Sequence, residues 1–149
     1  KVNVASTPRV GFAGMTHDHV WGLAPQWSEL DVELAAAADP NGPLRDRMSR
    51  EVGVSRTYDG FEDMFAAEDL DIVTVCLDNA HHADVVDAAA AAGVHCLVEK
   101  PMAATLDQAE RMLTAAGEHG ITLMINWPTN WMPIYREAAR MAAAGDLGR

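Results

Sequence analysis

Hydrophobic residues along the chain gather in short runs that alternate with longer amphipathic stretches. The run DIVTVCL, residues 71–77, is apolar almost throughout, as expected of a strand that is covered on both faces. Shorter runs of this kind predict further strands at 9–14, 32–39, 55–58, 95–100 and 121–127. Alanine-rich or periodic segments predict helices at 20–30, 43–53, 61–68, 82–92, 106–119 and 134–144.

This alternation predicts the fold class. Strands that alternate with helices form a mostly parallel, doubly wound sheet covered on both faces, so we expect a three-layer α/β domain of the Rossmann type. The carboxyl ends of the strands then share one edge, and ligands bind there between the first and fourth strands, where the strand order reverses. The segments at that edge are 14–19, 39–42, 78–82, 100–102 and 126–131.

Composition narrows the classes of partner. The net charge of −11, from 22 acidic and 11 basic residues, argues against binding to nucleic acid or to an anionic membrane. No apolar run reaches the roughly 18 residues of a transmembrane helix, and no signal peptide is visible, so we expect a cytoplasmic protein. Cys76 and Cys96 lie within apolar runs and are interpreted as buried thiols.

Two charged residues end predicted strands at the ligand edge. Asp39 follows the second strand, where a carboxylate can accept hydrogen bonds from both ribose hydroxyls of an adenosine and repel a 2′-phosphate. This favours NAD over NADP, and a turn-forming aspartate in DPNG is the alternative. Lys100 ends the fifth strand, where it can orient a substrate oxygen or carry a proton. An ordinary exposed lysine is the alternative there.

Histidines follow two strands that are neighbours in such a sheet. His17 and His19 follow the first strand and His81 and His82 the fourth, so the four imidazoles are expected to converge on one crevice with Asp78. Neutral imidazole suits zinc and other first-row metals, which keeps a metal-dependent hydrolase or lyase open as an alternative.

The loops leave other interpretations open. Thr16 or Asp18 can cap the following helix, with the histidines as polar loop residues, or the histidines can contact substrate hydroxyls. Trp127 and Trp131 offer aromatic faces that stack well on sugar rings. The alternative is that these tryptophans pack the last helix against the sheet or against a further domain.

Three segments resemble the Gfo/Idh/MocA oxidoreductases. AGVHCLVEKPMAATLDQAERML (92–113) resembles the part of that family with the Glu-Lys-Pro motif. DIVTVCLDNAHHADVVDAAAAAG (71–93) resembles the preceding strand, loop and helix, with Asn79 and His82 at the positions of Asn-x-x-His. AAAADPNGP (35–43) resembles the second strand and its ribose-binding acid. The resemblance runs from about Arg9 to the end of the chain.

The resemblance implies a nicotinamide-dependent oxidoreductase of sugars or polyols, with NAD as the cofactor. Residues 1–149 would be its N-terminal dinucleotide-binding domain, inactive alone and without the C-terminal α+β substrate domain, and the full-length protein would form a homo-oligomer. Lys100 would be the catalytic residue, and this interpretation assigns no metal ligand. The expected cofactor-binding residues are Gly14, Met15, Thr16, His19, Asp39, Leu77, Asn79, His82 and Glu99. The expected substrate-binding residues are His17, Lys100 and Trp127.

The first turn departs from the family pattern. The family commonly has Gly-x-Gly-x-x-Gly or Ala there, whereas this chain, aligned on Gly14, has Thr16 and His19 in place of the second and third glycines. A Cβ at the second position crowds the pyrophosphate of a dinucleotide. A non-redox family member, which binds a sugar or regulates a partner, is therefore a further alternative.

Overall fold

The computed structural model describes residues 7–148, and its centre is a parallel sheet. The six strands lie in the order β3-β2-β1-β4-β5-β6, so the order reverses beside β1 and the predicted Rossmann-type fold class is confirmed. The strands are β1 (Arg9–Ala13), β2 (Glu33–Ala38), β3 (Arg56–Tyr58), β4 (Ile72–Val75), β5 (His95–Glu99) and β6 (Leu123–Asn126).

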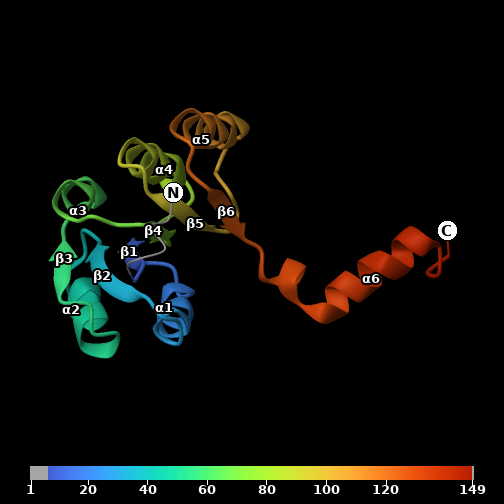
Figure 1. Cartoon of the computed structure of the whole chain (residues 1–149), viewed down its shortest axis with the longest axis horizontal. Coiled ribbons are helices and arrows are strands. Elements are labelled where there is room, and N and C mark those ends of the chain that lie inside the picture. The colour runs from blue at the N-terminus through green and yellow to red at the C-terminus, as the bar shows by residue number, and fades with distance from the viewer. Residues whose placement is uncertain (1–6, 149) are drawn as a thin grey trace.

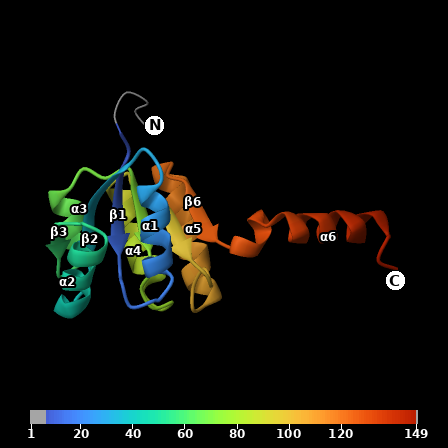
Figure 2. The same ribbon diagram turned by 90° about the horizontal axis from the view of Figure 1, so that it is seen from below.

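Helices cover both faces of the sheet, as the alternating pattern predicts. One face carries α1 (Val20–Ser28) and α2 (Gly42–Glu51) (Figures 1 and 2). The other carries α3 (Phe61–Ala67), α4 (His82–Ala91) and α5 (Leu106–His119). Each predicted element is present within a few residues of its expected bounds. The 3₁₀ helix η1 (Pro128–Trp131), which follows β6, was not predicted.

The hydrophobic core has one part on each side of the sheet. Val73 and Val75 of β4 pack towards α4, while Val10 and Phe12 of β1 pack towards α1 and α2. All four side chains are fully buried, because successive residues of a strand point to opposite faces and both faces are covered. Both cysteines are buried and free as predicted, and burial raises the pKa of each thiol to about 12.

The last helix, α6 (Pro133–Ala144), extends away from the sheet (Figures 1 and 2). None of its residues is buried. Trp127 and Trp131 are 45% and 60% exposed, so the alternative in which they pack this helix against the sheet is wrong for the described residues. No helix in the described part of the chain has the length and apolar character needed to cross a membrane.

Gly14 holds the chain after β1 close to the chain after β4. Its φ of +84° lies in the left-handed region that favours glycine. A Cβ at this position would lie 2.7 Å from the backbone nitrogen of Leu77 and 2.8 Å from its Cα. The turn that begins the ligand edge therefore requires a residue without a side chain.

We expect Gly14→Ala to lower the free energy of unfolding in urea by about 2–5 kcal/mol, since it adds a steric clash to the strain of a positive φ. Gly53→Ala is the matched control: its φ is +87°, but an added Cβ would meet nothing within 4 Å. That variant should lose only about 1–2 kcal/mol. Equal losses would contradict the close approach at Leu77.

Candidate functional site

A buried carboxylate joins the ends of β1 and β2. Asp39 is 2% exposed. The backbone N–H of Met15 donates to its Oδ2 at 2.6 Å, and that of Asn41 donates to its Oδ1 at 2.8 Å. These charge-assisted bonds offset the cost of burying the charge. The turn-forming role of Asp39 is thus observed, and ribose binding through the remaining oxygen lone pairs stays a prediction.

From Thr16 onward, the loop after β1 presents its side chains to solvent. Thr16, Asp18 and His19 are exposed, and His17 is half-buried. The backbone N–H of His17 donates to the carbonyl oxygen of Cys76, which holds the loop against the end of β4. The N-cap of α1 is His19, with no side-chain cap hydrogen bond, so the alternative of capping by Thr16 or Asp18 is wrong.

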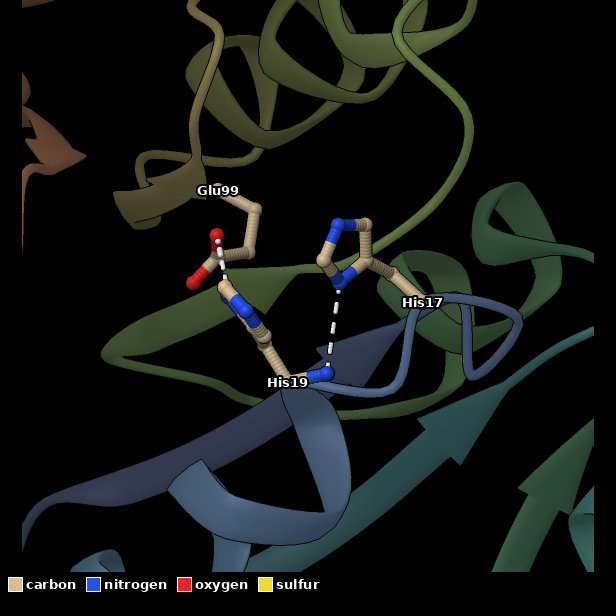
Figure 3. A group of neighbouring side chains, drawn as sticks. All are labelled: His17, His19 and Glu99. Carbon is tan, nitrogen blue, oxygen red and sulfur yellow. Dashed lines mark hydrogen bonds and ion pairs between the residues drawn. The ribbon is translucent and has the colours of Figure 1, made fainter.

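Glu99, at the end of β5, faces this loop (Figure 3) and also contacts the end of β6. Its side chain is 1% exposed, and its Oε2 lies 2.9 Å from His19 Nδ1. The backbone N–H of Lys100 donates to Oε2 at 3.2 Å, and the Asn126 side-chain amide donates to Oε1. The His17 ring lies edge-on to His19, with 4.4 Å between centroids.

Asn126 was not among the predicted site residues. It ends β6 at the same edge as Glu99, and the two are paired in the strand register. A polar residue that closes an otherwise apolar strand at the ligand edge is the signal that could have identified it.

The other two histidines lie in separate environments, so the predicted convergence of four imidazoles is wrong. His81 is exposed and lies 2.8 Å from Asp78, and this hydrogen bond raises the pKa of His81 and lowers that of Asp78. His82 is fully buried, with Nδ1 3.2 Å from the carbonyl oxygen of Met102 and Nε2 3.3 Å from that of Leu77. His81 therefore pairs within the loop after β4, whereas His82 lies between that loop and the loop that follows β5.

The position of His82 changes its expected role. Its ring has no exposed surface to offer a ligand, and it instead bridges the loop after β4 and the loop that follows Lys100. It is a positioning residue in this structure. Direct contact between His82 and a cofactor is not possible without movement of these loops.

Two hollows lie at the ligand edge, on either side of the turn that follows β1 (residues 14–19, the β1 turn). The first, of about 270 Å³, is lined by Ala38, Asp39, Pro40, Asp59, Gly60, Phe61, Glu62, Leu77, Asp78 and His81. The second, of about 290 Å³, is lined by Asp18, His19, Gly22, Leu23, Gln26, Glu99, Asn126 and Pro128. An apolar groove of about 340 Å³ that includes Trp27 and Trp131 shares Leu23, Gln26 and Asn126 with the second hollow.

The remaining predicted site residues are distributed along the same edge. Lys100 and Asn79 are half-buried. Leu77 lines the first hollow, and Trp127 is 45% exposed directly after β6. The Met15 side chain is fully buried in the core, so only its backbone takes part in the turn.

Comparison with known proteins places this architecture among oxidoreductases. The Gfo/Idh/MocA family, described as an oxidoreductase family with an NAD-binding Rossmann fold, matches residues 9–127. A D-xylose 1-dehydrogenase (NADP+) of Haloferax volcanii is 31% identical over 138 residues, which cover 93% of this chain and 42% of that protein.

Two solved structures have a fold similar to that of this chain. A 3-ketoreductase from Actinomadura kijaniata, in complex with TDP-benzene and NADP, is 32% identical with a TM-score of 0.82, and the match covers 94% of this chain and 43% of that one. The scyllo-inositol dehydrogenase of Lactobacillus casei, with bound NAD(H) and scyllo-inositol, has a TM-score of 0.86 at 22% identity, over 96% and 43% of the two chains. The latter likeness shows the fold alone. The chain spans about two fifths of the length of these relatives.

We expect His82→Leu to lower the free energy of unfolding by about 1–3 kcal/mol, because it leaves a buried carbonyl oxygen without its donor. Amide hydrogen exchange should accelerate in segments 77–82 and 100–104, which the ring connects. His81→Ala, at the exposed neighbouring position, is the control and should change neither measurement appreciably. Similar effects of both variants would refute the bridging role of His82.

Proposed function

The chain belongs to the Gfo/Idh/MocA family of oxidoreductases with an NAD-binding Rossmann fold, and we propose that it binds NAD along the ligand edge. Hydride would pass between the nicotinamide and a sugar-like or polyol substrate. The observation that carries the proposal is the pair of hollows on either side of the β1 turn. A dinucleotide lying across the point where strand order reverses would place one nucleoside in each.

The charges around the first hollow support NAD rather than NADP. Its lining includes four carboxylates, those of Asp39, Asp59, Glu62 and Asp78. A 2′-phosphate on the adenosine ribose would be repelled by them. The neighbouring guanidinium of Arg45 is already bound, with Asp59 Oδ1 at 2.6 Å and the carbonyl oxygen of Asp39 at 2.5 Å.

Lys100 is the proposed catalytic residue. It directly follows the buried Glu99 at the carboxyl end of β5, and a lysine there can orient the reacting oxygen of the substrate and accept or return its proton. The nicotinamide, when bound, supplies the hydride chemistry. His17 would contact substrate hydroxyls, and the exposed face of Trp127 would stack on a sugar ring.

The remainder of the site is proposed to lie on a further domain. The length of the relatives supports this, because this chain spans only about two fifths of it. The second hollow is open to solvent, and closing a substrate against it requires additional protein surface. We expect the present chain to bind cofactor without turning substrate over.

Calorimetric titration in the presence of a chelator should show that NADH binds at least about tenfold more tightly than NADPH, a difference of about 1.4 kcal/mol. Replacing two hollow-lining acids together, Asp59→Asn and Glu62→Gln, should narrow that difference by weakening the repulsion. Glu29→Gln together with Asp31→Asn, in the exposed turn after α1, removes the same two charges away from the hollow and is the charge-matched control. Tighter binding of NADPH would overturn the cofactor preference, and no binding of either by folded protein would favour the non-redox alternative.

In the full-length protein, Lys100→Met should reduce kcat by about 10²- to 10⁴-fold, because the group that handles the proton is removed. Oxidation of a panel of aldoses and inositols, followed by NADH absorbance, gives the rates. NADH affinity should change little. Arg136→Met, which removes an exposed cation on α6, should leave kcat unchanged, and an undiminished kcat in Lys100→Met would refute the assignment.

A further inference from the structure

Three side chains, two from the β1 loop and one from the end of β5, offer metal-ligand atoms to one point in the structure. They are His17, His19 and Glu99, and their ligand atoms all lie within 4.8 Å of one another (Figure 3). We propose that these residues form a binding site for one divalent first-row transition metal ion, with zinc as the reference ion. The site shares the second hollow with the proposed dinucleotide position, and it goes beyond the proposed oxidoreductase function.

The donor set fits such an ion. Two imidazoles and one carboxylate are the ligands of many zinc sites that keep a position open, and the same combination binds non-haem iron. A group of at least three candidate ligands at this spacing occurs only here among residues 7–148. The set differs from the metal site suggested by the sequence, which combined His17 and His19 with two histidines that the fold places elsewhere.

The geometry needs only a small adjustment. Tetrahedral zinc with bonds of about 2.0–2.1 Å holds its ligand atoms roughly 3.4 Å apart. His19 Nδ1 and Glu99 Oε2 are 2.9 Å apart, so this pair separates slightly to admit the ion. His17 and His19 belong to a solvent-facing loop, so their rings can rotate to close the remaining distances. An ion would displace any proton that His19 Nδ1 shares with Glu99.

Glu99 supplies the rigid part of the site. Its carboxylate is 1% exposed and already oriented by the Asn126 amide and by the backbone N–H of Lys100. Hydrogen-bond partners of this kind fix a ligating carboxylate and raise metal affinity. A buried carboxylate also benefits from a cation beside it, because burial otherwise disfavours its charge.

The ion would not be enclosed by protein. His19 and Glu99 both line the second hollow, of about 290 Å³, and the His19 side chain is 44% exposed. Asp18, on the same lining, adds negative charge at the opening. A water molecule or a substrate oxygen can therefore complete the coordination, which is the arrangement of a site that binds ligands through its metal.

The test uses zinc alone as the probe. After dialysis against a chelator, calorimetric titration with zinc chloride should show one ion bound per chain. The binding heat should depend on the ionisation enthalpy of the buffer, because the ligands release protons. Cobalt(II) should give the visible absorption of a low-symmetry site. His17→Ala should weaken zinc binding by at least about tenfold, the lower end of the loss produced by removing only a supporting partner.

Control variants distinguish this site from zinc binding by any exposed histidine. Glu99→Gln should also weaken zinc binding. Because Glu99 is buried, this substitution can impair folding, and the His17→Ala variant then still tests the site. His81→Ala removes an exposed histidine outside the cluster and should leave zinc affinity unchanged. No stoichiometric binding, or equal weakening by His17→Ala and His81→Ala, overturns the proposal. The NADH titration is made with chelator present, so the two proposals fail separately.

Discussion

The hydrogen bonds of one buried carboxylate determine where the ligand edge begins. Asp39 accepts hydrogen bonds from the backbone N–H groups of Met15 and Asn41. These bonds connect the chain after β1 to the chain after β2. Gly14 lets the same turn approach the backbone of Leu77 closely, which no other residue type allows. These contacts anchor the loop that follows, residues 16–19, so that His19 lies against Glu99 at the end of β5.

A second buried carboxylate organises the other half of the edge. Glu99 accepts a hydrogen bond from the side-chain amide of Asn126 and faces His19. The end of β5, the end of β6 and the loop after β1 therefore meet at this side chain. Because Lys100 is the next residue, its position depends on the same contacts. His82 supports the loop after Lys100 by bridging the carbonyl groups of Leu77 and Met102.

These two halves suit different chemistry. The side near β2 is acidic, whereas the side near β5 and β6 combines imidazole, carboxylate and amide groups beside an apolar groove. Thr16 and His19, which replace two glycines of the family turn, belong to the loop between them. The substitution that makes the turn unusual for a dinucleotide thus also brings an imidazole to Glu99, where a metal ion can bind.

The amino-acid sequence alone predicted the helices and strands. It also predicted that the polar candidate residues lie at the carboxyl edge of the sheet. The apolar run 71–77 became β4, the helix at 106–119 was predicted with its observed bounds, and Asp39 and Lys100 follow strands as expected. The partners of the polar side chains emerged only from the tertiary structure: Glu99 for His19, 80 residues away, and two backbone carbonyls for His82. Periodicity reports which face of an element is buried, because burial acts on each segment locally. The choice of partner depends on register and rotamers across strands that are distant in the chain.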